Sequence, residues 1–166
     1  MQKITPHLWY TDKAAEAARF YASIFPDSRV ERVTPIASDS PSGPAGSVDM
    51  VEFTLFGQPF KAISAGPLDP FNHAISFMVN CDTQEEIDRY WDALLPGGSP
   101  EQCGWLKDKY GLSWQIVPTE LSAMMADGDR ERAKRVGDAM LKMVKLDIAA
   151  LRAAFAGGRV KTGSKR

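Results

Sequence analysis

The chain has 166 residues, of which 44% are apolar and 25% charged, an ordinary composition for a soluble globular domain. Twenty basic and 21 acidic side chains leave a net charge of −1, so no overall field attracts nucleic acid. No apolar run approaches the roughly 18 residues that a membrane helix needs, and the N-terminus lacks the apolar core of a signal peptide. Two cysteines make no disulfide framework. We expect a cytoplasmic protein that binds neither nucleic acid nor membranes.

The first part of the chain predicts a strand, a helix and three further strands. Residues 3–11 form a short apolar run that contains Pro6, which is typical of an edge strand. Asp12 is expected to be the N-cap of a helix that runs through Phe25, because apolar side chains recur there at helical spacing. Alternating apolar residues then predict three strands. These strands are expected at residues 29–36, 47–57 and 58–66.

The second part repeats this order. Residues 72–81 predict a strand, and Thr83 with Glu86 forms a T-x-x-E capping box at the start of a helix. The apolar stripe of that helix is expected to be buried. It consists of Ile87, Tyr90, Trp91 and Leu94. Residues 96–98 end the helix, and two strands follow at 103–108 and 111–118, so a third strand in this unit is poorly marked.

The two units align with one another, which indicates a duplicated module. A shift of 70 residues places Asp12 on Asp82, and a shift of 54 places Phe60 on Trp114. About sixteen extra residues in the first unit account for the change of shift, and most of them fit the Ser-, Gly- and Pro-rich segment 37–46. This segment is either a lid over a cavity or a long connection, and we favour the connection.

Beyond Pro118 the pattern predicts helices only. A short helix is expected at residues 119–126, a second one capped by Asp129 and ending near Val144, and a third one capped by Asp147 and ended by Gly157-Gly158. The second helix has an apolar, Met-rich face that fits either a partner surface or a lid over the core. This face comprises Ala133, Val136, Met140, Met143 and Val144.

The sequence therefore predicts an α+β fold with two βαβββ modules and a C-terminal helical extension. The expected boundaries are residues 1–67 for module one, 70–118 for module two, 119–157 for the helices and 158–166 for a basic tail. The tail lacks an apolar pattern, so we expect it to be disordered rather than to bind nucleic acid.

Two such modules in one chain resemble the vicinal oxygen chelate superfamily, also called the glyoxalase/bleomycin-resistance/dioxygenase fold. The runs ITPHLWYTDKAAEAARFYASIFPDS, AISFMVNCDTQEEIDRYWDALLPGG and QCGWLKDKYGLSWQIVPTEL closely resemble its PhnB-like group, often labelled 3-demethylubiquinone-9 3-methyltransferase. The resemblance extends over residues 2–157, including the closing helix. It implies a single glyoxalase-like domain, 1–157, that encloses a cavity, and a homodimer. The chain has no G-x-G-x-G run for a methyl donor, so we do not expect ubiquinone methylation.

Metalloenzymes of the superfamily take four His, Glu or Gln ligands from the first and last strands of the two modules. The candidates of these types here are His7, His73, Glu52 and Gln115. Counting along the strands places two of the family's ligand positions near Thr5 and Ala74. The repeat pairs Gln115 with Lys61, whose protonated amine cannot coordinate a metal. We therefore expect no four-ligand metal site and no other cofactor. A weaker site built from those candidates stays an alternative, because a one-residue bulge would turn side chains to the other face of a strand. The sequence does not determine which faces Lys61 and His73 occupy.

Several side chains are candidates for the wall of a ligand cavity, although burial in the core is the commoner fate of strand aromatics. They are His7, Trp9, Phe60, Phe77, Trp105, Trp114 and Gln115. Cys103 has no neighbouring motif that would activate its thiol, so we expect it to be inert.

Two functions remain. The favoured one is a small-molecule binding protein without a metal, as bleomycin-resistance proteins are in this fold. The alternative is a metal-dependent lyase, isomerase or dioxygenase in which the ion polarises substrate oxygens and Glu52 moves protons. The sequence leaves open both catalysis and the identity of the ligand.

Overall fold

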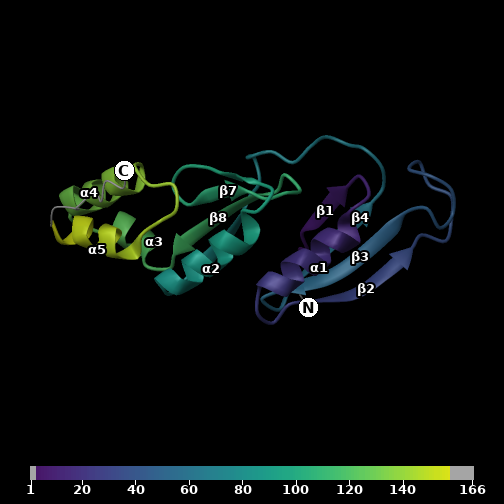
Figure 1. Ribbon diagram of the computed structural model, residues 1–166, viewed down its shortest axis with the longest axis horizontal. Coiled ribbons are helices and arrows are strands. Elements are labelled where there is room, and N and C mark those ends of the chain that lie inside the picture. The colour runs from purple at the N-terminus through teal and green to yellow at the C-terminus, as the bar shows by residue number, and fades with distance from the viewer. Residues whose placement is uncertain (1–2, 158–166) are drawn as a thin grey trace. The chain divides into compact units, whose positions relative to one another are not determined.

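The structure is a computed structural model that describes residues 3–157. The chain divides into two compact units, with Pro70 ending unit 1 and Phe71 beginning unit 2 (Figure 1). Each unit has one four-stranded sheet and one helix that follows its first strand.

Unit 1 has the βαβββ order that the sequence predicts. Its elements are β1 (His7–Tyr10), α1 (Ala14–Ile24), β2 (Arg29–Pro35), β3 (Asp49–Leu55) and β4 (Gln58–Ser64). The strands are arranged β1-β4-β3-β2, with β1 parallel to β4 and the other neighbours antiparallel. Strand β1 begins only after Pro6, which has no backbone N–H to donate to a sheet. Helix α1 lies across one face of this sheet (Figure 1).

The start of α1 differs from the prediction. The N-cap is Lys13, which makes no side-chain cap, and Asp12 lies one residue too early. The backbone N–H of Ala14 instead donates to the Ser64 hydroxyl of β4 at 3.0 Å. A tertiary contact therefore satisfies the donor that a local cap would otherwise satisfy.

A tight hairpin joins β3 to β4. Phe56 and Gly57 both have positive φ, 50° and 70°, as a two-residue turn of type I′ requires. The Gly57 N–H donates to the carbonyl of Asp27 at 2.8 Å, and a Cβ on Gly57 would lie only 2.9 Å from the Asp27 carboxylate. Glycine is thus required here by both the turn and the close approach.

Unit 2 has the same topology, so the duplication predicted from the sequence is present in the fold. Its strands are β5 (Phe77–Cys81), β6 (Ser99–Pro100), β7 (Trp105–Lys107) and β8 (Ser113–Pro118), arranged β5-β8-β7-β6. The poorly marked third strand is β6, only two residues long. Strand β5 begins five residues later than predicted, because the side chain of Asn72 accepts the N–H of Ala74 in a local turn.

Helix α2 (Gln84–Leu94) has the predicted capping box. The Thr83 hydroxyl accepts the Glu86 N–H at 3.2 Å, and the Glu86 carboxylate accepts the Asp82 N–H at 2.8 Å. The predicted apolar stripe is buried, from Ile87 to Leu94.

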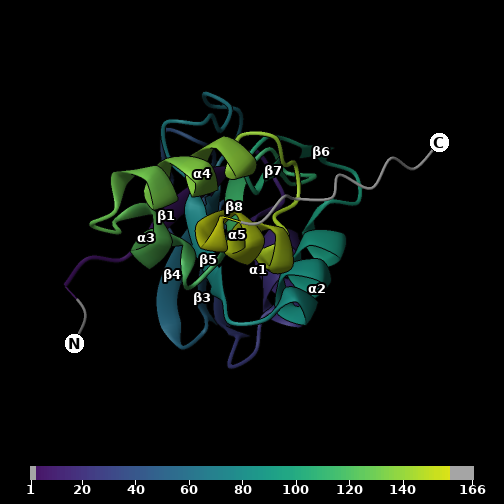
Figure 2. The ribbon, with the colours of Figure 1, turned by 90° about the vertical axis from the view of Figure 1, so that its left-hand side faces the viewer.

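The C-terminal part forms α3 (Leu121–Met125), α4 (Arg130–Met140) and α5 (Ile148–Ala156), beyond the end of β8 (Figures 1 and 2). Asp129 and Asp147 cap α4 and α5 as predicted, and Gly157 ends α5 with a φ of 84°. Helix α4 ends four residues earlier than predicted. The backbone carbonyls of Met143 and Val144 accept the N–H groups of Cys103 and Gly104, which holds this segment against the loop before β7. Gly158 and the predicted tail lie outside the described residues.

These helices fill a core of unit 2. One cluster joins β8 to all three helices, and it contains Val136, Met140 and Met143 of the predicted apolar face. Its members are Val117, Leu121, Met124, Val136, Leu146 and Leu151, with Met140, Met143 and Phe155 packed against them. These three residues of the predicted face therefore pack inside unit 2, as a lid over the core would, whereas Val144 is 39% exposed. Within residues 3–157, no helix combines the length and the apolar character that crossing a membrane requires.

Candidate functional site

Strand alternation gives each sheet a helix-covered face and an open face. In unit 1 the Tyr10 hydroxyl lies 3.2 Å from that of Tyr21 on α1, which places Tyr10 on the covered face. Phe60 shares this face and stacks on Phe53 with 5.4 Å between ring centroids. Phe60 is therefore packed under α1 and does not reach the open face.

A row of polar side chains crosses the open face of unit 1. The sheet register pairs His7 with Lys61, Lys61 with Glu52, and Glu52 with Arg32, one residue from each strand. The Lys61 ammonium lies 3.0 Å from one Glu52 carboxylate oxygen. Arg32 donates Nε at 3.0 Å, and also Nη2, to the other oxygen. Glu52 is thus held between two cations.

These contacts set the ionisation of Glu52. The hydrogen bonds from Arg32 and then Lys61 hold the pKa of the Glu52 carboxyl below its usual value. The carboxylate therefore stays charged throughout the neutral range.

An apolar row lies beside the polar one on the same face of the sheet. It consists of Trp9, Ile63 and Met50, each two residues away from a member of the polar row. The register pairs Trp9 with Ile63 and Ile63 with Met50. Trp9 and Met50 pack against a buried cluster that contains Ile63. The Trp9 indole N–H donates to the carbonyl of Gly66 at 2.9 Å, which fixes the ring in place.

A surface depression of about 470 Å³ lies where the two rows reach β2 and β3. Its lining residues include Arg32, Thr34, Ile36, Ala37, Met50 and Glu52. Of the predicted lid or connection at 37–46, Ala37 lines the depression. The rest of that segment folds back on itself, and the Ala45 N–H donates to the Asp39 carboxylate at 2.9 Å.

The open face of unit 2 has a different set of side chains. The register pairs Met78 with Gln115, and Gln115 with Trp105. The Gln115 amide donates to the Ser76 hydroxyl at 2.8 Å, and Met78 is 53% exposed. Phe77 and Trp114, with 5.7 Å between their rings, lie on the other face of the sheet.

Trp114 and His73 both take part in specific polar contacts. The Trp114 indole N–H donates to the buried carboxylate of Asp108 at 2.8 Å. His73 lies in the loop before β5, and its Nε2 is 2.8 Å from both carboxylate oxygens of Glu101. The His73 ring is 6.1 Å from that of Trp105. His73 is therefore paired within unit 2, outside any strand.

The structure corrects the strand counting behind the predicted metal positions. Thr5 and Ala74 lie outside β1 and β5. The residues opposite Lys61 and Gln115 are His7 and Met78 instead. The sequence analysis missed Met78, and it also missed Arg32.

Within unit 1, the two metal candidates His7 and Glu52 lie apart from one another. His7 and Glu52 stand two strands apart, roughly 10 Å between backbones at the usual strand spacing, with Lys61 between them. Within residues 3–157, no three His, Cys, Asp or Glu side chains cluster closely enough to hold a metal ion.

Two βαβββ units, each with its first strand parallel to its last, define a protein of the vicinal oxygen chelate superfamily. The model of the 3-demethylubiquinone-9 3-methyltransferase family matches residues 2–117. The chain belongs to this family, which is the PhnB-like group. The match ends at the end of β8, so the C-terminal helices that we had included in the resemblance lie beyond it.

The chain is similar to several solved structures, of which the first supports this assignment. The PhnB protein of Bacillus cereus, which bears the same methyltransferase name, is 36% identical with a TM-score of 0.61, over 70% of this chain and 99% of that one. PA1353 of Pseudomonas aeruginosa, at 20% identity and a TM-score of 0.54 over 71% and 98% of the chains, shares the fold. The Listeria monocytogenes fosfomycin resistance protein FosX, solved with Mn(II) and sulfate, is 12% identical over 70% and 92%, with a TM-score of 0.44. A search of curated proteins found no significant match.

Proposed function

We propose that this chain is a small-molecule binding protein whose ligand occupies the depression on the open face of unit 1. Its volume of about 470 Å³ falls within the range of small-molecule sites, roughly 300–1,000 Å³. The main support for the proposal is that the lining of this depression combines apolar and polar side chains. Met50 and Ile36 supply apolar surface, while Arg32 and Glu52 supply polar groups. Such sites use apolar contact for affinity and a few polar groups for orientation.

The residues at the superfamily's metal positions do not suit a divalent ion. We take these positions to be the paired residues of the first and last strands, which are His7 with Lys61 and Met78 with Gln115. The Lys61 ammonium is paired with Glu52, and a thioether such as that of Met78 is a soft ligand that suits Cu(I) better than Mn²⁺ or Mg²⁺. This disagreement supports a binding protein over the alternative metal-dependent lyase, isomerase or dioxygenase.

Glu52 also fits poorly as a general base. A base works best when its pKa is near the working pH, whereas Arg32 and Lys61 lower the pKa of Glu52. We therefore assign Glu52 a role in arranging charge, without a proton-transfer step.

The family name does not lead us to assign methyl transfer. Packing explains why residue 98, after the end of helix α2, is a glycine. A Cβ at this position would lie 2.0 Å from the carbonyl oxygen of Lys107. Gly98 allows β6 and β7 to approach closely and needs no bound methyl donor to explain it.

A fluorescent apolar probe, N-phenyl-1-naphthylamine, tests the proposed site. We expect Thr34→Glu and Met50→Glu to weaken its binding at least tenfold, because each places a carboxylate in the apolar part of the depression. Thr34 is exposed, so that variant should keep the fold even where Met50→Glu does not, and circular dichroism checks both.

Met125→Glu is the matched control. Met125 lines a second depression, of about 490 Å³, between α3 and α4. It should change the affinity less than twofold. Loss of probe binding in Met125→Glu with none in Thr34→Glu would overturn the proposed location.

We also propose a cytoplasmic homodimer, as the family resemblance implies. Light scattering should then give a mass near twice the 18.3 kDa of one chain, and a monomer mass at micromolar concentrations would contradict it.

A further inference from the structure

We propose that the ligand of this depression is an amphiphilic anion, with an apolar planar body that lies against Met50 and Ile36 and one oxyanion group that pairs with Arg32. This inference rests on the proposed function and adds the chemical class of the ligand.

The charges of the polar row do not balance. Arg32 and Lys61 contribute two positive charges, and Glu52 contributes one negative charge. The neighbouring Arg29 is balanced separately, since it forms an ion pair with Glu31 at 2.8 Å. Among the described residues, Glu52 is the only acidic partner of Arg32 and of Lys61. The row therefore has one surplus positive charge.

The Arg32 guanidinium has an N–H group that can donate hydrogen bonds to a ligand. Arg32 uses Nε and Nη2 on a single oxygen of Glu52, so the Nη1 amino group is not engaged with that carboxylate. The Arg32 side chain lines the depression and is 66% exposed, which keeps it accessible to a ligand. A planar guanidinium suits carboxylate, sulfonate and phosphate oxygens alike.

The spacing of the two rows defines the shape of the ligand. They are two residues apart along each strand, roughly 7 Å at the usual rise of a strand. This is about the length of a two-ring aromatic system. A molecule with an anionic group at one end and a flat apolar body of that length would contact both rows, whereas a neutral apolar molecule would leave the surplus charge without a partner.

A pair of probes with the same rings tests the inference. 8-Anilinonaphthalene-1-sulfonate has the aromatic skeleton of N-phenyl-1-naphthylamine together with a sulfonate. We expect the wild-type protein to prefer the sulfonate, and Arg32→Gln to weaken sulfonate binding at least fivefold while neutral-probe binding changes less than twofold. Arg29→Gln, a change of the same type on the same strand, should leave both affinities unchanged because Arg29 is balanced by Glu31.

Glu52→Gln should change sulfonate affinity in the opposite direction to Arg32→Gln. Removing this carboxylate releases both cations, so sulfonate affinity should rise several-fold, and an unchanged or lower affinity would contradict the charge balance. If Arg32→Gln and Glu52→Gln leave the ratio of the two affinities unchanged while Thr34→Glu abolishes binding of both probes, the ligand class is wrong and the site stands. If Thr34→Glu and Met50→Glu do not affect the neutral probe, the proposed function itself fails.

Discussion

At the scale of single residues, the two cysteines differ in the state of their thiols. Cys81 is fully buried on β5, and this burial, with Glu86 and Asp82 nearby, raises the pKa of its thiol to about 12. Cys103 is partly exposed in the loop before β7. The sequence predicts an inert Cys103, but its partial exposure changes this expectation. Because the thiolate is the reactive form, we expect an aromatic disulfide reagent at pH 8 to titrate one accessible thiol in the native protein and two after unfolding.

Cys103→Ser should abolish the native reaction, and Cys81→Ser should leave it intact. At pH 10 the Cys81 thiol should still be protonated because burial raises its pKa to about 12, so this thiol should stay unreactive while the protein is folded. Two thiols that react equally fast in the native protein would contradict the assignment.

Strand alternation in the sequence indicates which side chains share a face, but not what binds there. His7 and Trp9, predicted to line a cavity, and Glu52, predicted as a catalytic or metal candidate, all lie on the open face of unit 1. Arg32 was missed because the pairing of β2 shifts between Val30 and Arg32, and such a bulge changes which side chains share a face. Phe60 and Trp114 were correctly paired by the repeat, but the face that a helix covers is a tertiary property that the pattern of one strand does not contain.

At the scale of elements, local chemistry predicted helix starts better than helix ends and strand starts. The caps at Thr83, Asp129 and Asp147 are as expected, because each depends on atoms within three residues. The Asp12 cap and the length of α4 were wrong because distant groups decide them: the Ser64 hydroxyl in one case and the loop at residues 103–104 in the other.

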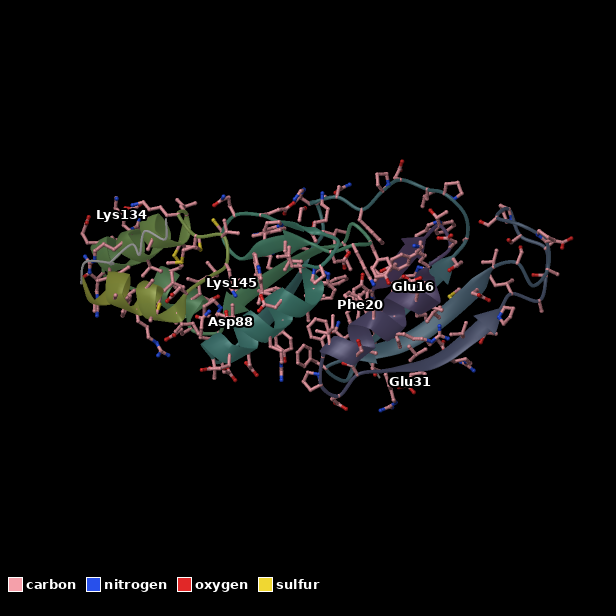
Figure 3. The ribbon with its side chains drawn as sticks, in the orientation of Figure 1. Glu16, Phe20, Glu31, Asp88, Lys134 and Lys145 are labelled. Carbon is pink, nitrogen blue, oxygen red and sulfur yellow. The ribbon has the colours of Figure 1, made fainter. Side chains whose placement is uncertain are left out.

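One side chain joins the C-terminal helices to α2. The amide of Gln84 donates to the carbonyl of Leu146 at 3.1 Å, and its oxygen accepts the N–H of Ile148 at 2.9 Å. An ion pair of 2.9 Å between Asp88 and Lys145 lies beside it (Figure 3). We expect Gln84→Ala to lower the free energy of unfolding by about 1–3 kcal/mol, because two backbone groups lose their partner. Urea unfolding measures this change.

Hydrogen exchange locates the effect of Gln84→Ala. The amides of α5 should exchange faster, while those of α1 in unit 1 should not change. Gln102→Ala, at an exposed position in the same unit, is the matched control and should alter stability by less than about 0.5 kcal/mol. Equal destabilisation by both variants would show that Gln84 does not join these elements.

At the scale of the whole molecule, the two units share one topology, but the connection between the first strand and the helix differs by one residue in length. Equivalent residues of α1 and α2 are 70 positions apart in the sequence. The pairs His7–Lys61 and Met78–Gln115 show that equivalent residues of β1 and β5 are 71 positions apart. The connection from β1 to α1 is accordingly one residue longer than that from β5 to α2. Counting from the helix caps could not detect this difference, although it detected the repeat.

The register of the first and last strands in each unit determines what we expect of metal binding by the whole protein. The family resemblance implies metal ligands on the first and last strands of both units, where the strand pairs contain one imidazole, His7, and one amide, Gln115, beside Lys61 and Met78. We expect the purified protein to retain no stoichiometric metal. Calorimetry with Zn²⁺, Ni²⁺, Mn²⁺ and Fe²⁺ should show no tight site. Lys61→Glu supplies a carboxylate opposite His7, so it should bind Zn²⁺ more tightly than the wild type does. Uptake of one ion per wild-type chain, lost in His7→Ala and kept in His73→Ala, would show instead that His7 belongs to a metal site despite Lys61.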